Sequence, residues 1–257
     1  EDTFGRAYVK SCNKTSLQFL LPLQDGAVTG YDFYLDLADG RRTILWTAGA
    51  NSLLSPERIE SNAIQEAELL LIDGGALDLG PEAEAAVSFS LKLAEEAHVP
   101  FVLTLASVRV VESYRSFFDI YAPRAQFVAG NLEQTAVLLD LQSEASLADV
   151  RAELAKNSIN AVVTMDANGS FARFGDEEVL QRTQKIDAFD SVGAGDNFLG
   201  AFLVAKLNGL SVPEALVVGN LISSKIIQIQ RARFPLGYDI LGLLDEAIRK
   251  AEGLLTT

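Results

Sequence analysis

The spacing of apolar residues changes near residue 50 and divides the chain into two patterns. Before that point, three segments at 16–22, 30–37 and 43–46 are rich in β-branched, aromatic and leucine residues, and Asp39-Gly40 supplies turn residues between two of them. Such segments are typical of consecutive hairpins. The pattern therefore predicts a small β-sheet over residues 16–47.

Beyond Asn51, short apolar runs alternate with longer segments that repeat apolar residues at helical spacing. Runs at 68–72, 100–105, 125–129 and 159–165 are typical of buried strands. Helices are expected between and after them, at 56–67, 81–97, 110–120, 132–141, 147–156, 211–230 and 241–254. Strands separated by helices predict an α/β protein whose mainly parallel sheet is covered on both faces. Because no stretch has the composition of a linker, we expect one domain over residues 1–257.

A polar, glycine-containing stretch runs from Asp190 to Asp196 and leads into the apolar run Phe198–Ala205. This order predicts a loop that enters the N-terminus of a buried helix. The first N–H groups of a helix lack internal partners and lie at the positive end of its dipole, so they bind anions such as phosphate. Asp196 has two interpretations, a plain helix cap or a general base beside an anion-binding turn. The glycines before it favour the second.

Composition narrows the range of partners. The chain holds 21 basic and 35 acidic residues, a formal charge of −14, which argues against nucleic acid as a partner. A nucleotide is compatible with this charge, because Mg²⁺ and local backbone amides bind phosphate within an acidic protein. With one cysteine, Cys12, and one histidine, His98, the chain forms no internal disulfide, and a Cys/His metal site is close to excluded.

The sequence also bears on location and completeness. No stretch has the length and apolarity of a membrane span and no signal peptide is visible, so we expect a cytoplasmic protein with no membrane partner. The chain starts at Glu1, and its only methionine is Met165. We therefore expect that a segment before Glu1 is absent from this sequence.

The stretch Asp190–Phe198, D-S-V-G-A-G-D-N-F, resembles the C-terminal signature of the PfkB/ribokinase family of carbohydrate and nucleoside kinases, D-[ST]-x-G-A-G-D-x-F. The resemblance implies a ribokinase-like three-layer α/β/α sandwich with a small β lid, and ATP with Mg²⁺ as the phosphoryl donor. It also implies that Asp196 takes the proton from the acceptor hydroxyl. The amides of Gly193, Ala194 and Gly195 would then hold the transferring phosphoryl group.

Weaker resemblances fall on the nucleotide side. Asn131 matches the family's N-x-x-E, but Gln134 stands where the family has Glu. Thr164 and Gly169 match T-x-G-x-x-G, but Asp166 replaces its first glycine. Asn220 falls where ribokinase-like kinases place an adenine-contacting Asn. Each of these residues also has a structural explanation. Asn131 is about equally well explained as a helix cap, and Asn220 as a polar residue on a mostly apolar helix. Residues 166–169 are also a good turn between strands.

The same signature is associated with a monovalent cation in many relatives. Asp190 and the carbonyl of Val192 match that site. Arg231 replaces a glycine in the segment that completes it, so potassium dependence is left open.

The N-terminal part resembles the acceptor side of the family. Asp2-Thr3-Phe4-Gly5 is similar to the motif D-x-[FY]-G, and Thr29-Gly30 to the Thr-Gly of the lid. The stretches 40–43 and 49–51 are similar to a ribokinase-like G-x-R-T…G-A-N pattern, which implies that Gly49 and Asn51 belong to the substrate lid. In the family this sheet often builds a homodimer contact.

Three functions stay open at this point. The 49–51 stretch favours a sugar of the ribose, fructose or keto-sugar class as the acceptor, and this interpretation is slightly ahead. Residues 101–105 and the segment after Pro213 look more like adenosine-kinase relatives, so a nucleoside kinase is the alternative. The departures at Gln134, Asp166 and Arg231 motivate a hypothesis of a different class, a catalytically weakened scaffold that binds a ligand or a partner protein.

Overall fold

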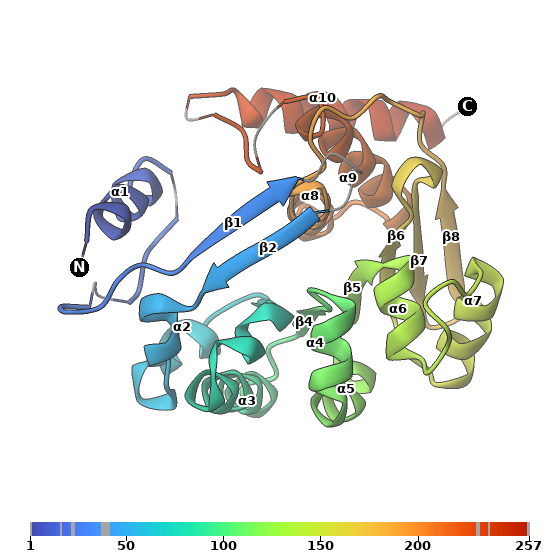
Figure 1. Ribbon diagram of the computed structural model, residues 1–257. Helices are drawn as coiled ribbons and strands as arrows, with labels where there is room; N and C mark the ends of the chain where they lie inside the picture. Colours follow the sequence, from blue (N-terminus) through green and yellow to red (C-terminus); the bar gives the residue numbers. More distant parts are fainter. Residues whose placement is uncertain are drawn as a thin grey trace. The chain divides into compact units, whose positions relative to one another are not determined.

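The computed structural model describes residues 2–15, 17–21, 24–36, 42–229, 232–235 and 237–255 (Figure 1). The Asp39-Gly40 turn, Gly40 and Arg41 of the lid pattern, and Arg231 lie outside the described residues. The chain separates into two compact units, residues 1–101 and 102–257. The single domain expected over 1–257 stays a prediction.

The first unit contains three helices and three strands in its described part, together with 3₁₀ turns at Gly49–Leu53, Pro56–Arg58 and Gly74–Leu79. In chain order, these elements are α1 (Thr3–Cys12), β1 (Tyr31–Asp36), β2 (Arg42–Thr47), α2 (Ser61–Gln65), β3 (Leu70–Ile72) and α3 (Pro81–Glu96).

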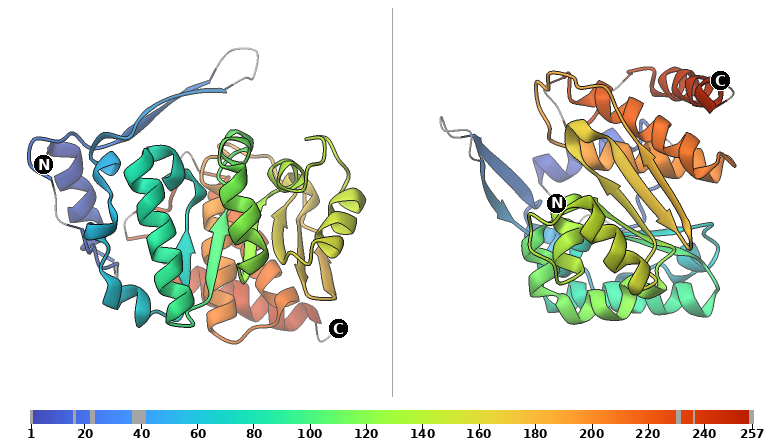
Figure 2. Two further views of the ribbon diagram at one scale, coloured as in Figure 1. Left: turned by 90° about the horizontal axis from the view of Figure 1, so that it is seen from below. Right: turned by 90° about the vertical axis from the view of Figure 1, so that its right-hand side faces the viewer.

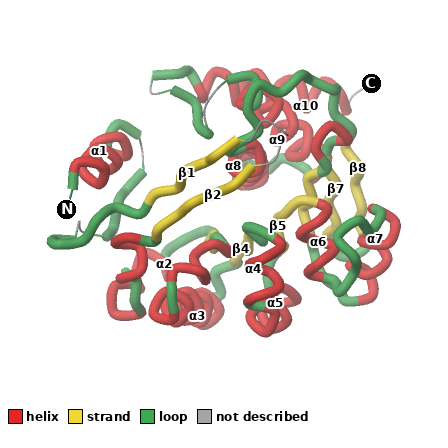
Figure 3. The backbone as a smooth tube through the Cα atoms, viewed as in Figure 1, coloured by secondary structure: helices red, strands yellow, loops and turns green. Residues whose placement is uncertain are grey.

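β1 and β2 form an isolated antiparallel hairpin, in register from Tyr31 opposite Thr47 to Asp36 opposite Arg42 (Figures 1 and 3). This confirms the strands expected at 30–37 and 43–46. The strand expected at 16–22 is wrong, because residues 17–21 form no regular element. Phe19 instead packs edge-to-face on Tyr8 of α1, with ring centroids 6.1 Å apart. The apolar run therefore covers a helix rather than pairing with a strand.

Helix α1 is an element that the sequence patterns did not predict. Asp2 caps it by accepting a hydrogen bond from the Gly5 amide at 2.8 Å. The same carboxylate accepts hydrogen bonds from the amide and the hydroxyl of Thr29, at 2.8 and 2.7 Å. These bonds, led by the one from Gly5, hold the pKa of the Asp2 carboxyl well below its usual range. The two N-terminal motifs are thus joined through one side chain.

The second unit holds most of the regular structure, and the boundary between the two units falls within β4. Its elements are β4 (Phe101–Thr104), α4 (Val108–Ser113), α5 (Arg115–Tyr121), β5 (Phe127–Asn131), α6 (Leu132–Leu138), α7 (Leu147–Lys156), β6 (Ala161–Thr164), β7 (Ser170–Phe174), β8 (Glu177–Gln181), α8 (Ala194–Leu207), α9 (Val212–Ile226) and α10 (Ile240–Leu255). Short 3₁₀ turns lie at Ala122–Arg124 and Asp166–Asn168.

The strands of this unit follow the order β4-β5-β6-β7-β8. β4, β5 and β6 run parallel to one another, as predicted, and their first three residues are buried. β7 and β8 then form an antiparallel hairpin that the apolar pattern did not separate. Figure 2 shows α6 and α7 on one side of these strands and α8 and α9 on the other. This arrangement is the expected α/β/α layering.

Candidate active site

The loop before α8 is fixed by backbone contacts that only glycine permits at position 193. The amides of Phe189 and Asp190 both donate to the Ile227 carbonyl, at 2.7 and 3.1 Å. Gly193 has φ +78°, and a Cβ there would lie 2.2 Å from the Ala232 carbonyl oxygen. A residue with a side chain would therefore be both strained and in collision with the backbone.

The helix predicted to follow the 190–196 loop begins earlier than expected, at Ala194, so Ala194, Gly195 and Asp196 belong to the first turn of α8. The Ala194 amide donates to the Ser191 carbonyl at 3.2 Å, which closes the turn. Among the described residues, the amides of Gly193 and Gly195 have no hydrogen-bond acceptor. Asp196 lies exposed in the first helical turn. The arrangement therefore offers two amides and a carboxylate at the positive end of a helix dipole.

Contacts with α9 and with Ala232 hold this helix start in place. The ring of Phe198 packs against Gly219 of α9, where a Cβ would come within 2.8 Å of it. The hydroxyl of Ser223, also on α9, donates to the Ala194 carbonyl at 3.2 Å. The side-chain amide of Asn197 donates to the carbonyls of Gly193 and Ala232, at 2.8 and 3.0 Å. The first turn of α8 is therefore anchored to two neighbouring segments, α9 and the segment that contains Ala232.

Asn131 and Gln134 form a reciprocal capping box at the start of α6. The Asn131 side-chain oxygen accepts from the Gln134 amide at 2.8 Å, and the Gln134 side-chain oxygen accepts from the Asn131 amide at 2.9 Å. The Gln134 side-chain nitrogen also donates to the Ala106 carbonyl at 2.9 Å. An ionised glutamate cannot make this last bond, because it has no proton to donate. The bond to Ala106 therefore gives a structural reason for Gln rather than Glu at position 134.

Thr164 and Gly169 bracket a tight turn between β6 and β7, as expected for residues 166–169. Gly169 has φ +92°, and a Cβ there would lie 2.1 Å from the Gln181 carbonyl oxygen, so the close approach of β8 requires glycine. Asp166 is exposed and has φ +48°. The Thr164 hydroxyl lies 3.5 Å from the Gly130 carbonyl oxygen, at the limit of a hydrogen bond.

A chain of neighbours brings the nucleotide-side residues of the second unit to one edge of the sheet. Asn131 pairs with Thr164, and Thr164 pairs with Ser170. Ser170 pairs with Gln181, whose carbonyl accepts a long bond of 3.4 Å from the Asn220 side chain. Asn220 lies one helical turn before Ser223, which contacts Ala194. All of these residues therefore share the edge formed by the carboxyl ends of β5 and β6, where α/β folds place ligands.

The proposed cation ligands lie in the loop itself. The Asp190 carboxylate accepts from the Val192 amide at 3.0 Å, which shapes the turn before Gly193. Among the described residues, no group of three or more His, Cys, Asp or Glu side chains is arranged to hold a metal ion. The carboxylates at this edge, Asp166 and Asp196, are compatible with Mg²⁺ that arrives on phosphate oxygens, since Mg²⁺ usually takes few protein ligands.

The lid residues of the first unit border a cavity of about 460 Å³. Asn51, Thr29 and Gly30 supply its polar wall, and Tyr8 and Phe19 belong to its apolar wall. Gly49 does not line this cavity but shapes its border, because its φ is +51° and a Cβ there would lie 2.4 Å from the Val28 carbonyl oxygen. The cavity has the mixed lining that small polar ligands require.

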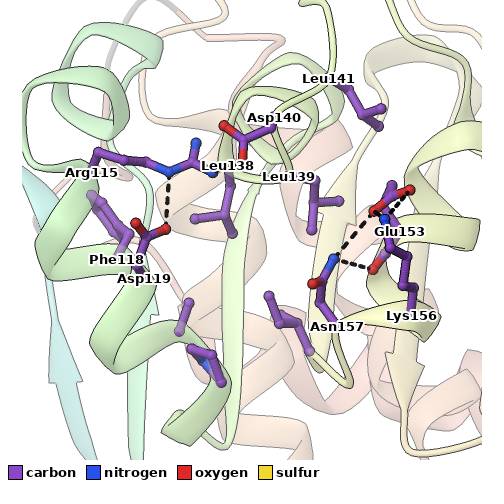
Figure 4. A pocket seen from close by; sticks show the side chains of 13 residues that line it. Arg115, Phe118, Asp119, Leu138, Leu139, Asp140, Leu141, Glu153, Lys156 and Asn157 are labelled. Atoms are coloured by element: carbon purple, nitrogen blue, oxygen red, sulfur yellow. Dashed lines mark hydrogen bonds and ion pairs between the residues drawn. The ribbon is translucent and has the colours of Figure 1, made fainter.

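A second cavity, of 410 Å³, lies in the second unit, at the opposite end of its strands from the edge that carries Asn131 and Thr164 (Figure 4). Pro123 and Ile159 on its wall precede β5 and β6, so it is at their amino ends. Its charged side chains pair with one another: Arg115 with Asp119 at 3.0 Å, and Lys156 with Glu153 at 2.9 Å. This internal pairing leaves the signature edge as the better candidate for an active site.

The sequence missed several residues that support the site. Gly219 and Ser223 make their contacts across long sequence separations, so no local pattern reveals them. The capping role of Gln134 could have been found, because Asn followed three residues later by Gln is a capping-box pattern.

None of the helices in the described part of the chain is long and apolar enough to cross a bilayer.

Comparison with known proteins agrees with this geometry. The model of the pfkB family of carbohydrate kinases matches residues 1–237. A 5-dehydro-2-deoxygluconokinase from Shouchella clausii is 25% identical over 237 residues, which cover 88% of this chain and 72% of that protein. In a second one, from Halalkalibacterium halodurans, 184 residues are 28% identical and cover 69% of this chain but 55% of the relative.

Solved structures share the fold. The adenosine kinase from Sinorhizobium meliloti superposes with a TM-score of 0.85 at 24% identity, covering 98% of this chain and 75% of the other. The ribokinase from Thermotoga maritima gives a TM-score of 0.69 at 19% identity, covering 100% and 79%. Both likenesses confirm the expected architecture, a mainly parallel central sheet between helices with a small antiparallel sheet.

Proposed function

Because this chain belongs to the pfkB family of carbohydrate kinases, we propose that it transfers the γ-phosphoryl group of ATP to a hydroxyl of a small sugar. The observation that carries the proposal is the start of α8, where Asp196 lies beside the Gly193 and Gly195 amides. The acceptor class that we propose is the ribose, fructose or keto-sugar class.

Each group at the helix start has a role in this reaction. Asp196 takes the proton from the acceptor hydroxyl as that oxygen attacks the γ-phosphorus, a contribution of roughly 10²- to 10⁴-fold for general-base catalysis. The amides of Gly193, Ala194 and Gly195 face the charge on the transferring phosphoryl oxygens. The Ala194 amide already donates to Ser191 at 3.2 Å, so its neighbours carry more of this role.

The nucleotide is proposed to lie along the carboxyl edge of β5 and β6. Asn131, Thr164 and Gly169 border its phosphates, and Asn220 its base. Mg²⁺ would neutralise the phosphate oxygens when ATP is bound. Potassium at Asp190 and the Val192 carbonyl is a further part of the proposal, supported by the ordered turn that the Asp190 carboxylate makes with the Val192 amide.

The acceptor side is supported by the cavity that Asn51 lines. Side-chain amides such as that of Asn51 donate to and accept from sugar hydroxyls. The curated relative named 5-dehydro-2-deoxygluconokinase favours a keto-sugar acid over a nucleoside. The likeness to adenosine kinase is below 25% identity and concerns the fold alone, so nucleoside phosphorylation is the second candidate.

The scaffold hypothesis loses part of its motivation. Gln134 is a capping residue with three hydrogen bonds, so its presence does not require that catalysis was lost. A scaffold without nucleotide use would show little stabilisation by Mg-ATP, whereas an enzyme with ATP well above its Kd gains a few kcal/mol. Thermal shift with Mg-ATP therefore separates the two hypotheses.

We also propose that the protein is cytoplasmic, and its single cysteine, Cys12, is compatible with a reducing compartment. We further propose a second copy of this chain as a partner. Both faces of the β1–β2 hairpin expose apolar side chains: Phe33 and Leu45 on one face, Ile44 and Trp46 on the other. A two-stranded sheet alone is marginally stable in water, so burial against another copy would stabilise it.

The test is ADP release with Mg-ATP across 5-dehydro-2-deoxygluconate, ribose, fructose and adenosine. Asp196→Asn should lower the turnover rate by a factor of roughly 10² or more, because the base is removed. Asp187→Asn, an exposed carboxylate before the signature, is the matched control and should retain full turnover. Absence of turnover on every acceptor, together with no Mg-ATP thermal shift, would contradict the proposed function.

A further inference from the structure

Asp166 is an unusual residue at the edge where we place the nucleotide. Its φ of +48° is in the left-handed region, which glycine, asparagine and aspartate adopt more readily than other residues. The turn does not require a charge at this position, because glycine or asparagine would adopt the same φ. A charge that the turn does not need, at the edge of a proposed site, is a reason to look for a function of its side chain.

The Asp166 carboxylate does not hold the turn together. Backbone bonds close it: the Asn168 amide donates to Met165 at 2.9 Å, and the Gly169 amide donates to the Asp166 carbonyl at 3.2 Å. Within the described ranges, the side chain makes no hydrogen bond or ion pair, and it is exposed. Arg182, whose backbone abuts Gly169, forms no ion pair with it there either.

An unpaired carboxylate beside bound triphosphate is unfavourable. Two like charges several ångströms apart repel each other even at the effective dielectric constant of a protein surface. A divalent cation between them reverses the sign, because carboxylate and phosphate oxygens are both ligands that Mg²⁺ prefers. The turn lies beside Thr164, which pairs with Asn131 at this edge.

We propose that Asp166 binds, directly or through water, the divalent cation that accompanies ATP. With the cation bound, this carboxylate would help to hold Mg-ATP at the edge, whereas ATP without the cation is repelled by it. Asp166 is thus a positioning residue that makes nucleotide binding depend on the metal. The proposal rests on the proposed function, because it requires that this edge binds ATP.

The experiment is calorimetric titration of ATP into the protein, once with Mg²⁺ and once with EDTA, in the absence of any acceptor. In the wild type, the Kd in EDTA should exceed the Kd in Mg²⁺ by about tenfold or more. In Asp166→Asn that ratio should be several-fold smaller than in the wild type, because metal-free ATP binds more tightly and Mg-ATP more weakly. It should stay above one, because Asp196 and the net charge of −14 still disfavour metal-free ATP. Asp166→Gly, which also suits the positive φ, should behave like Asp166→Asn.

Asp176→Asn is the matched control. Asp176 is an exposed aspartate in the turn at the other end of β7, so its removal changes the net charge equally without touching the proposed site. Its Kd ratio should equal that of the wild type. An unchanged ratio in Asp166→Asn would overturn this proposal and leave the kinase intact, whereas a wild type that binds ATP under neither condition would overturn the proposed function as well.

Discussion

Gly193 is the residue on which the geometry of the signature loop most depends. Its positive φ and its approach to Ala232 act together, so no other residue satisfies both. Gly169 repeats the same combination against Gln181 on the nucleotide side. Both glycines therefore allow one backbone segment to approach another closely: the signature loop approaches Ala232, and the turn after β6 approaches Gln181.

Gly193→Ala should destabilise the protein by about 1 to 3 kcal/mol, through strain at positive φ and the collision with the Ala232 carbonyl. Gly200→Ala is the control, since no atom lies within 4 Å of a Cβ at this exposed position inside α8. It should leave stability unchanged or raise it by up to about 1 kcal/mol. Urea unfolding measures both, and equal midpoints for the two variants would contradict this account of Gly193.

At the scale of elements, the site depends on the packing of α8 against α9. α9 supplies Gly219, Ser223 and Asn220 to the site, so its position controls the start of α8. A capping box begins α9: the Ser211 amide and hydroxyl both donate to the Glu214 carboxylate. The Ser211 hydroxyl bond, then the amide bond, hold the pKa of Glu214 below its usual value.

Ser211→Ala should cost about 1 kcal/mol of stability near neutral pH, because it removes the cap. A carboxyl whose pKa is lowered by folding stabilises the protein above its unfolded pKa, about 4.3, and this contribution is lost as the pH falls through the folded value. The difference in Tm between wild type and variant should therefore shrink below about pH 4. A difference that stays constant from pH 7 to pH 3 would contradict the role given to Glu214.

Element prediction from sequence succeeded where local periodicity was strong. The helix over 147–156 matches α7 at both ends, and a buried helix follows the glycine-containing loop as expected, although it begins at Ala194 inside that loop. It failed where tertiary contacts decide. The run 17–21 packs on α1, and the helix expected at 110–120 breaks at Tyr114 into α4 and α5. The helix expected at 56–67 likewise becomes a 3₁₀ turn and the short α2.

The candidate site was predictable to different degrees. The contiguous signature at 190–198 could be located from sequence because its residues are consecutive. The meeting of Asn131, Thr164 and Asn220 at one edge needed the strand register, which sequence alone does not supply. The reason for Gln134 lies in its bond to Ala106, which is 28 residues away.

At the scale of the whole molecule, the exposed β1–β2 hairpin predicts association between copies. Phe33→Asp should shift the protein toward monomer in sedimentation velocity, because a charge on this apolar face costs desolvation when it is buried. Ile120→Asp places the same charge on another exposed apolar residue, on α5, and should leave the mass unchanged. If wild type and Phe33→Asp sediment alike, the hairpin is not the contact.

The most direct test of the central claim, phosphoryl transfer to a sugar hydroxyl with Asp196 as base, is ³¹P NMR. The protein, Mg-ATP and 5-dehydro-2-deoxygluconate, or the acceptor selected by ADP release, are followed over time. A new phosphomonoester resonance should grow with the β-phosphate signal of ADP in the wild type and be absent with Asp196→Asn. A product signal of equal rate in Asp196→Asn, or ADP accompanied only by inorganic phosphate, would contradict the account.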